Sequence, residues 1–309
     1  MAGSGSGTTT SATVANVVPT VISAARELVE KPTVMSDKNV VTKRMIKDGD
    51  GLTYNWPKFG TNFAAQSLTE AVAINNPQTL IPSTQQFTTS EIGVMFLLTD
   101  RAKRVTNEDL AGRGGRFMGN AIRRNVETTG LGLFSGLSRD LGAAGNSFNP
   151  NFIAAAKVRL RSGTETNQTE PVSGEITAIV QPYHIHDILT SSGTLGTTGG
   201  NENVLATGRQ PIDGWTEELV REYDIKRVYG VNIAGAPLIT IDGSDDAVGA
   251  IFSNMAFLYV GTSNDMHVEK DRDISLRAEV MVMTKEFGFA ELEDQFGFAI
   301  TADASVPTS

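Results

Sequence analysis

A helical repeat of apolar residues marks the longest predicted helix, from Asn107 to Phe134. The repeat is formed by Leu110, Met118, Ala121, Ile122, Val126 and Phe134. Asn107 is the expected N-cap because its side chain can accept a hydrogen bond from the first turn. At 1.5 Å per residue, such a helix would be about 40 Å long. A shorter amphipathic helix is predicted between Pro19 and Pro32.

Four glycines lie within this long predicted helix: Gly112, Gly114, Gly115 and Gly119. Each costs about 1 kcal/mol relative to alanine in a helix interior. Gly115 and Gly119 lie four residues apart and therefore share one helix face. This spacing is typical of close approach by another backbone, but it fits a kinked or late-starting helix equally well. Both interpretations stay open at the level of the sequence.

Two strands with a long polar segment between them are predicted in the first third of the chain. The first runs from Leu52 to Phe59 and the second from Phe87 through Leu98. The segment between them contains Pro77 and Pro82 and few apolar residues. This pattern indicates a long protruding hairpin that builds little core of its own. We therefore expect it to pack against something outside its own domain.

The C-terminal segment predicts a β hairpin. A period of two over ten residues indicates a strand with one buried face. Its apolar set is Ile274, Leu276, Ala278, Val280 and Val282, which alternate with Ser275, Arg277, Glu279, Met281 and Met283. The Phe-Gly-Phe motif at 287–289 then recurs at 296–298, around an acidic turn that contains Glu291, Glu293 and Asp294. A second strand is therefore expected to return beside the first.

Residues 151–250 are predicted to form a mixed α/β block. The expected elements are a strand at Glu175–Val180, helices at Tyr183–Thr190 and Thr216–Tyr223, and further strand at Arg227–Ile241. A Gly- and Thr-rich loop at 191–208 separates the two helices and is expected to be exposed. Residues 1–13 are almost wholly Gly, Ser, Thr and Ala, a composition that predicts a flexible arm.

Composition and charge narrow the function classes. The 309-residue chain has 35 acidic and 26 basic residues, a net charge of -9, which is the wrong sign for tight sequence-independent binding of DNA or RNA. It has no cysteine, so disulfides, thiolate zinc sites and cysteine nucleophiles are excluded. The longest apolar run, Ile92–Leu98, is far shorter than the roughly 20 residues that cross a bilayer. We expect a soluble protein of about two domains.

Motifs for catalysis or ligand binding are weak. His184, His186 and Asp187 are the only residues that resemble a metal cluster, but two histidines at i and i+2 of a helix do not share a face. The segment Gly112–Arg116 lacks the Lys-Ser or Lys-Thr of a phosphate-binding loop, and no GxSxG nucleophile elbow occurs. We expect no catalytic, metal or cofactor site. A metal-dependent hydrolase built on His184 and His186 is the least favoured function.

Positive charge is concentrated between positions 100 and 125 of this acidic chain. The cations are Arg101, Lys103, Arg104, Arg113, Arg116, Arg123 and Arg124. One interpretation is a face that lies near DNA or an acidic partner. Ion pairing with Glu108, Asp109 and Glu127, within or between subunits, is the favoured interpretation.

The order of these elements resembles the major capsid protein of tailed bacteriophages, which has the α+β Hong Kong 97-type fold. The most similar stretches are VVPTVISAARELVEK, SEIGVMFLLTDRAKR and DISLRAEVMVMTKEFGFAELEDQFGFAITA. The resemblance implies an N-terminal arm at 1–45, an extended loop at 46–95 and an α/β axial domain at 150–250. It also implies a peripheral domain, with a long spine helix in its first part at 96–149 and a β sheet and C-terminal tail at 251–309.

The resemblance implies a structural role and no enzyme activity. Copies would assemble as pentamers and hexamers into an icosahedral head that encloses double-stranded DNA without sequence-specific binding. The implied partners are further copies of the chain, a separate scaffolding protein, a portal and in some shells a decoration protein, with no membrane. The implied location is the virion capsid, assembled in the host bacterial cytoplasm. An encapsulin-like compartment shell is the alternative.

A set of candidate assembly-interface residues follows from the same resemblance. They are Trp56, Lys58, Phe59, Arg113, Gly115, Arg116, Gly119, Arg123, Glu291, Glu293 and Asp294. Some shells of this family carry a lysine-to-asparagine crosslink, and Lys58 lies in the expected extended loop. Noncovalent locking is nevertheless the default expectation, because no acceptor or acidic catalyst can be assigned.

Overall fold

The computed structural model describes residues 34–35, 39–47, 51–59, 65, 67–68, 70, 77–79, 82–106, 110–163, 171–190, 227–262 and 266–307. The predicted arm at 1–13, the predicted helices at 19–32 and 216–223 and the loop at 191–208 lie outside these residues. The expected N-cap Asn107 also lies outside them.

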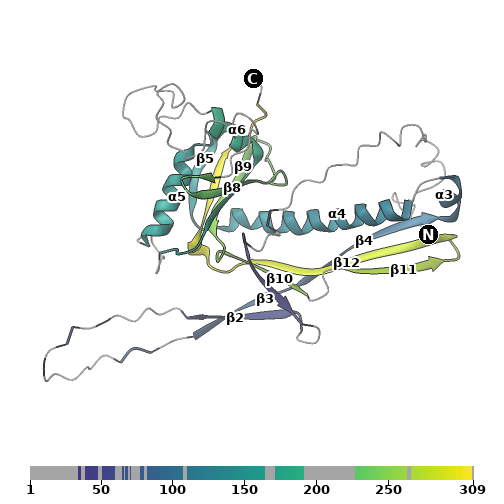
Figure 1. The fold of residues 1–309 in the computed structure, drawn as a ribbon, viewed down its shortest axis with the longest axis horizontal. Helices are drawn as coiled ribbons and strands as arrows, with labels where there is room; N and C mark the ends of the chain where they lie inside the picture. Colours follow the sequence, from purple (N-terminus) through teal and green to yellow (C-terminus); the bar gives the residue numbers. More distant parts are fainter. Residues whose placement is uncertain are drawn as a thin grey trace.

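The described part of the chain has two regions of different shape (Figure 1). In one region, α5 (Pro150–Ser162) and α6 (Pro182–Thr190) pack with a six-stranded sheet. In the other, α4 (Leu110–Leu131) lies along the long strands β4 (Ser90–Thr99) and β12 (Ala278–Glu291). This mixture of helices and sheets confirms the expected α+β class.

The remaining elements complete the two sheets and a hairpin. Their bounds are β1 (Thr42–Ile46), β2 (Thr53–Phe59), β3 (Pro82–Thr88), α3 (Asp100–Val105), η1 (Gly132–Gly136), β5 (Asp140–Ser147), β6 (Ile176–Val180), β7 (Arg227–Val228), β8 (Val231–Gly235), β9 (Asp246–Ser253), β10 (Phe257–Thr262), β11 (His267–Asp273), η2 (Asp294–Phe296) and β13 (Gly297–Asp303). The hairpin of β2 and β3 projects from the body at the lower left of Figure 1.

Strand β12 is the central strand of a five-stranded sheet. Along one edge it pairs antiparallel with β4, and along the other it pairs antiparallel first with β11 and then with β10. Strand β1 adds to β10 in parallel, with Thr42 opposite Leu258. The sheet therefore combines strands from the beginning, the first third and the last third of the chain.

Helix α4 covers one face of this sheet, as the helical repeat predicts. Met118, Ile122 and Val126 are buried against Met281 and Met283 of β12. The helix begins by Leu110 and runs unbroken through Gly112, Gly114, Gly115 and Gly119, so the late-starting alternative is wrong. Burial of one apolar stripe offsets the cost of the glycines.

The period-two pattern near the C-terminus starts four residues later than the sequence suggests. Residues 274–277 form a turn, in which Ile274 is 81% and Leu276 is 56% exposed. Arg277 closes this turn with a positive φ of 48°, and β12 begins at the next residue. Within β12, the face turned toward α4 is that of Met281 and Met283, while Val280 and Val282 are only half buried.

The single strand predicted from Phe87 through Leu98 is two strands, β3 and β4, which separate at Thr89. The backbone N–H of Thr89 donates to the carbonyl oxygen of Leu52 at 3.0 Å. Its hydroxyl donates to Oε1 of Glu286 at 2.6 Å. These bonds turn the chain, so β3 pairs with β2 while β4 pairs with β12.

The six-stranded sheet has the order β5-β13-β9-β6-β8-β7. The predicted strand at Glu175–Val180 is β6, all of whose residues are buried, and the predicted helix at Tyr183–Thr190 is α6. Strand β13 lies between β5 and β9, pairing in parallel with the first and antiparallel with the second. The predicted C-terminal hairpin is therefore wrong: β12 and β13 do not pair, because the turn at 291–296 passes the chain from the five-stranded sheet to the six-stranded one. Its core includes Ile153 and Leu160 of α5 together with Phe298 and Ile300 of β13.

Candidate functional site

The base of the projecting hairpin is fixed to the end of β12. The ammonium nitrogen Nζ of Lys58 lies 3.2 Å from Oε1 of Glu293 and also donates to the carbonyl oxygen of Leu292. The side-chain amide of Gln85, on the other strand of the hairpin, donates to the carbonyl oxygen of Glu291 at 3.0 Å. The structure thus brings together Lys58 and Glu293, which the sequence offers only as separate candidates.

An apolar cluster lies beneath these polar contacts. Phe87 of β3 is buried with Leu258, Val260 and Leu292, and Trp56 of β2 packs against this group. The guanidinium of Arg44 lies 5.3 Å from the centre of the Trp56 ring, a cation–π geometry. The base of the hairpin therefore has a core within its own chain, unlike the sequence expectation. Phe59 is the last residue of β2, opposite Pro82.

The acidic turn after β12 also holds its own chain. Oδ1 of Asp294 accepts from the backbone N–H of Ser138 at 2.9 Å, and Oδ2 accepts from the Ser138 hydroxyl. Glu291 lies beside Gly136, where an added Cβ would be 2.6 Å from its Oε1. Burial raises the pKa of Glu291, and the nearby charge of Asp294 raises it further. Hairpin, turn and η1 are therefore linked in one polar cluster.

Along α4, the glycines have unequal surroundings. A Cβ on Gly114 would lie 2.5 Å from the ring of Phe96, and one on Gly130 would lie 3.2 Å from Cβ of Met35. At Gly115 and Gly119 an added Cβ would meet nothing within 4 Å. Within the chain, close approach therefore occurs at Gly114 and Gly130, which the sequence analysis did not single out for it. No described residue of the chain occupies the surface at Gly115 and Gly119.

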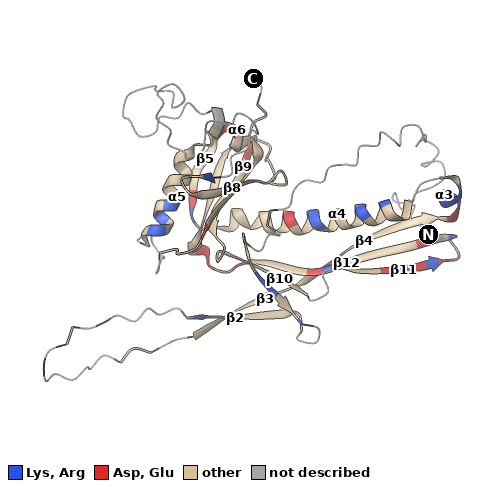
Figure 2. Cartoon of the chain, in the orientation of Figure 1, with Lys and Arg blue, Asp and Glu red and all other residues tan. Residues whose placement is uncertain are grey.

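The outward side of α4 carries the arginines that the sequence selects. Arg113, Arg116 and Arg123 are exposed, and Figure 2 shows the bands of positive charge along the helix. Phe117 is 61% exposed beside them. This combination of an exposed aromatic ring and cations is typical of a contact surface.

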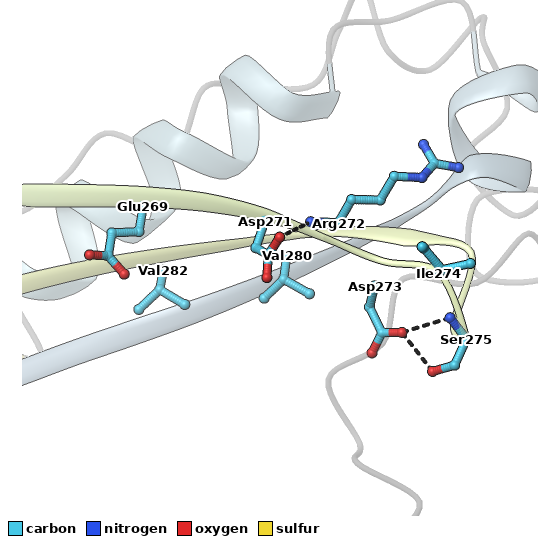
Figure 3. Close-up of a pocket in the computed structure, with 8 residues that line it drawn as sticks. All are labelled: Glu269, Asp271, Arg272, Asp273, Ile274, Ser275, Val280 and Val282. Atoms are coloured by element: carbon cyan, nitrogen blue, oxygen red, sulfur yellow. Dashed lines mark hydrogen bonds between the residues drawn. The ribbon is translucent and has the colours of Figure 1, made fainter.

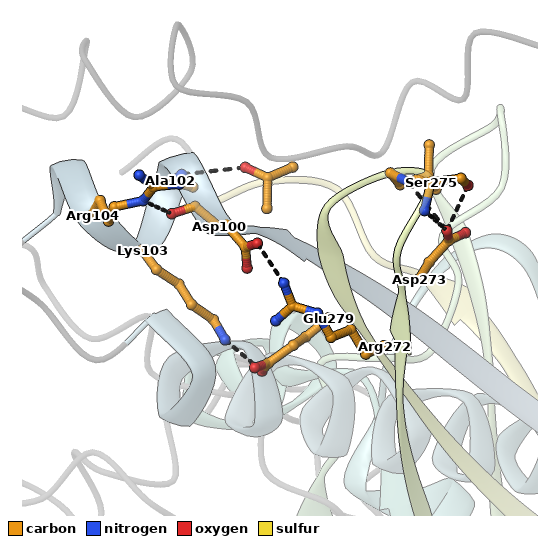
Figure 4. Close-up of polar contacts among 10 residues, drawn as sticks. Asp100, Ala102, Lys103, Arg104, Arg272, Asp273, Ser275 and Glu279 are labelled. Carbon is orange, nitrogen blue, oxygen red and sulfur yellow. Dashed lines mark hydrogen bonds and ion pairs between the residues drawn. The ribbon is translucent and has the colours of Figure 1, made fainter.

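A network of ion pairs fixes the turn between β11 and β12 to α3 (Figure 4). Oε2 of Glu279 lies 2.5 Å from Nζ of Lys103 and 2.8 Å from Nζ of Lys270. Hydrogen bonds from these two ammonium groups, Lys103 first, lower the pKa of Glu279 to about 2. Arg272 binds Asp100 at 2.8 Å in the same region. Lys103 therefore pairs with Glu279, whereas two of the acids expected from the sequence, Glu108 and Asp109, lie outside the described residues.

A shallow hollow of about 610 Å³ lies on the sheet face away from α4 (Figure 3). Val280 and Val282 form its apolar floor, and Glu269 and Asp271 of β11 line its edge. On β4, Met95 stands opposite Val282 and is 69% exposed. No described helix covers these positions, so this face presents apolar residues beside carboxylates.

The histidine pair does not build a metal site among the described residues. His184 is fully buried, stacked on Phe148 at 5.1 Å between ring centroids, with Nε2 3.3 Å from the carbonyl oxygen of Ala302. Asp187 accepts a hydrogen bond from the backbone N–H of Phe148 at 3.1 Å. In the part of the chain that the structure describes, no group of three or more metal-binding side chains occurs. Nor is any helix there long and apolar enough to cross a membrane.

Sequence reasoning missed Glu127 and Glu279 as organising residues. Glu279 binds lysines from α3 and β11, and Glu127 binds the backbone at positions 34 and 35. The buried site of Glu127 carried one usable signal, an acidic residue on the apolar stripe of a predicted helix one position after Val126. No local signal identifies the partners of Glu279, because they come from distant segments.

Comparison with known proteins finds its matches at the level of structure. Sequence comparison finds no matching family model and no curated relative. The capsid protein of Ralstonia phage GP4 superposes with a TM-score of 0.68 at 12% identity, covering 91% of this chain and 93% of that one. The capsid protein of cyanophage P-SCSP1u gives a TM-score of 0.66 at 11% identity, covering 89% and 90%.

A third solved structure agrees with these two. The head structure of Helicobacter pylori bacteriophage KHP40 superposes with a TM-score of 0.67 at 8% identity, covering 85% of this chain and 88% of that chain. In all three cases the similarity extends over both regions of the molecule, because most of each chain is matched. The chain therefore has the fold of bacteriophage capsid proteins.

Proposed function

We propose that this chain is the major capsid protein of a tailed, double-stranded DNA bacteriophage. The observation that carries the proposal is the match to capsid structures along nearly the whole chain, at 91% coverage of this chain and 93% of the Ralstonia phage GP4 protein. A fold hosts many functions in general. Here the surface supplies additional support, because it carries exposed large apolar side chains of the kind that neighbouring subunits cover in an assembly.

Assembly would proceed through head-to-tail contacts into pentamers and hexamers, because heterologous interfaces that close generate rings. The exposed Phe117 on α4, Met95 on β4 and Ile274 at the β11–β12 turn support this step. Large apolar side chains on a soluble subunit commonly mark protein–protein contacts. The hairpin of β2 and β3 supports it too, because it projects beyond the body (Figure 1).

The proposed division of labour follows the two regions of the molecule. Residues 150–250 would form the axial domain, and 96–149 with 251–309 the peripheral domain. Residues 1–45 would serve as the arm and 46–95 as the extended loop. The six-stranded sheet extends the axial unit by β5 and β13, since both strands pair within it. The candidate interface residues on α4, Arg113, Gly115, Arg116, Gly119 and Arg123, would then belong to the peripheral domain.

The shell would enclose DNA without gripping it. A net charge of -9 per copy opposes tight binding of a polyanion, which suits a container that is filled and later emptied. A scaffolding protein, a portal and in some shells a decoration protein would be separate partners. Assembly would take place in the host cytoplasm, and the mature location would be the virion.

The test is electron microscopy and sedimentation velocity of the full chain, alone and with its scaffolding partner. Capsomer rings or closed particles are expected. A stable monomer under all conditions contradicts the proposal. Particles that recruit an enzyme cargo and no DNA would favour the compartment-shell alternative.

A charge variant on α4 makes this test sharper. Phe117→Asp should prevent rings and particles while leaving the melting temperature of the subunit nearly unchanged, because Phe117 is exposed and packs on nothing in its own core. Asn125→Asp, at another exposed position of α4, adds the same charge and is the matched control. Equal assembly of both variants would remove Phe117 from the interface.

A further inference from the structure

The side chain of Glu127 is wholly buried, although it lies on a helix with an exposed side. Its Oε1 accepts hydrogen bonds from two successive backbone N–H groups, Val34 at 2.5 Å and Met35 at 2.7 Å. These residues precede Glu127 by more than ninety positions. One carboxyl group on α4 therefore holds the first described residues of the chain.

Such a contact is costly to open. A carboxyl group removed from water is strongly destabilising unless it is hydrogen-bonded, and backbone N–H groups that lose their acceptor inside a protein are penalised as well. Displacing residues 34 and 35 would leave both sides without these bonds until water enters. Breaking the contact therefore costs free energy on both sides, at the carboxyl group and at the two backbone N–H groups.

Gly130 prepares the same helix face for Met35. It lies three residues after Glu127 and so shares its side of α4. A Cβ at Gly130 would be 3.2 Å from Cβ of Met35 and 3.1 Å from the Phe289 ring, so an alanine there would crowd Met35 and Phe289 by a few tenths of an ångström. Met35 itself is completely buried, in a cluster with Leu131. Helix α4 thus presents, on one side, the carboxyl group of Glu127 as a hydrogen-bond acceptor and, one turn later, the space at Gly130 in which Met35 lies.

The segment after Met35 is held by different means. The backbone N–H and the hydroxyl of Thr42 both donate to the carbonyl oxygen of Asn254, at 3.0 and 2.8 Å. From Thr42 onward the chain pairs with β10. These anchors are independent of Glu127, so they provide an internal reference.

We propose that Glu127 and Gly130 form a clasp that fixes residues 34 and 35 on α4 and so fixes the point at which residues 1–33 are joined to the rest of the chain. The inference rests on the proposed function, in which an N-terminal arm reaches a neighbouring copy. Glu127 is then a positioning residue for that arm. Because the clasp lies on α4, a rotation of the helix about its axis would carry the arm origin with it, coupling two parts that a maturing shell would rearrange.

The first test is hydrogen exchange on the unassembled subunit. Glu127→Ala removes the acceptor and should lower the protection of the Val34 and Met35 amides by about tenfold or more. Glu127→Gln keeps an acceptor oxygen and should retain most of the protection. The Thr42 amide should be unchanged in both variants. A folded Glu127→Ala variant with unaltered protection at positions 34 and 35 would overturn the clasp.

A second variant covers the case in which Glu127→Ala does not fold. Gly130→Ala keeps the carboxyl group but crowds Met35 from the helix side, so protection at Met35 should fall while that at Thr42 stays the same. Gly132→Ala is the matched control, since an added Cβ there meets nothing within 4 Å. Equal protection at Met35 in both glycine variants would contradict the proposal.

The exchange measurement separates the clasp from the proposed function, because it needs no particle. If the unaltered chain forms no particles, the capsid proposal fails while the exchange result still decides the clasp. If particles form, those of Glu127→Ala should be fewer or irregular in electron micrographs, and Glu127→Gln should restore them. Normal particles from a Glu127→Ala subunit with lost protection would show that the clasp does not position the arm.

Discussion

The ammonium group of Lys58 lies 3.2 Å from Oε1 of Glu293, and this pair joins the base of the hairpin to the connection between β12 and β13. Both side chains are partly shielded from water, and Lys58 additionally donates to the backbone carbonyl of Leu292. A lysine held in this way within its own chain is occupied before any neighbour arrives. The pair is therefore one of the contacts that fix the hairpin to the rest of the chain, together with Gln85 and the apolar cluster around Phe87.

Breaking this pair should loosen the hairpin more than it destabilises the protein. A double-mutant cycle with Lys58→Ala and Glu293→Gln is expected to give a coupling energy of about 0.2–1 kcal/mol, decreasing with added salt. Proteolysis of the hairpin should accelerate in Lys58→Ala. Ser83→Ala, whose hydroxyl makes only a long contact of 3.5 Å to the Lys58 carbonyl, is the control. No change in cleavage rate would mean that the apolar cluster around Phe87 alone orients the hairpin.

Replacing two adjacent glycines of α4 by alanine should change the stability of the subunit in opposite directions. Gly115→Ala should raise the free energy of unfolding by about 0.5–1 kcal/mol, because it removes a helix-destabilising glycine into open space. Gly114→Ala should lower it by about 1–3 kcal/mol, because the Cβ would lie 2.5 Å from the Phe96 ring. Urea unfolding of the subunit measures both values.

The same variants test the predicted interface. If Gly115 and Gly119 receive a neighbouring backbone, Gly115→Ala and Gly119→Ala should impair ring formation even though each stabilises the isolated subunit. Normal rings from the double variant would assign these glycines no role in assembly.

The stability of the subunit should fall in mild acid because of His184. Burial lowers the pKa of His184 below 6.5, and the hydrogen bond with the Ala302 carbonyl and the charges of Asp187 on α6 and Asp303 on β13 only partly oppose this effect. The unfolded chain therefore takes up a proton near pH 6.5 while the folded chain does not. The free energy of unfolding should be flat above that pH, decrease as the pH falls below it, and level off below the folded-state pKa.

Denaturant titrations at pH 7.5 and 5.0 measure this dependence. His184→Phe should lose most of it, since a phenyl ring can stack on Phe148 without titrating. His186→Gln changes the other histidine of the same helix and should keep the dependence. An unaltered pH profile in His184→Phe would assign the acid sensitivity to other groups.

A second pH window belongs to Glu279. Its pKa is lowered from 4.5 to about 2 by the ammonium groups of Lys103 and Lys270, so its stabilising contribution is present above pH 4.5 and is lost as the pH falls toward 2. The protection of the α3 amides against hydrogen exchange, taken relative to the intrinsic rate at each pH, should therefore fall across this range. Glu279→Gln should show low protection in α3 already at neutral pH, with little further change in acid. Slow exchange in that variant would mean that Arg272 and Asp100 hold α3 by themselves.

The elements with strong periodicity could be predicted from sequence, and those defined by tertiary contacts could not. The helical repeat from Leu110 onward is local and gives α4 directly. The break at Thr89 is invisible locally, because it depends on hydrogen bonds to Leu52 and Glu286. The alternation that starts at Ile274 did not predict the face turned toward α4, for a related reason. Val280 and Val282 point to one face of the strand and Met281 and Met283 to the other, and both pairs are apolar. Only the position of α4 determines that Met281 and Met283 are the buried pair.

The candidate residues divide in the same way. The resemblance offers Lys58, Glu293 and Asp294 as assembly-interface candidates, and in the structure all three bind groups of their own chain. Their partners lie in other segments, at distances that no short motif encodes. The role of Gly115 as a contact with another copy stays a prediction, because only a neighbour can occupy the open space beside it.

The order of the six-stranded sheet also bears on how the protein is made. Strand β13 follows its five sheet partners in the sequence, yet it lies between β5 and β9. Until β13 has been synthesised and inserted, β5 and β9 have unpaired edges facing one another. A chain still being synthesised therefore cannot complete the six-stranded sheet before β13 has been made. Under the proposed function, a chain could join a shell only after β13 has been inserted, so incomplete chains would be kept out of the growing particle.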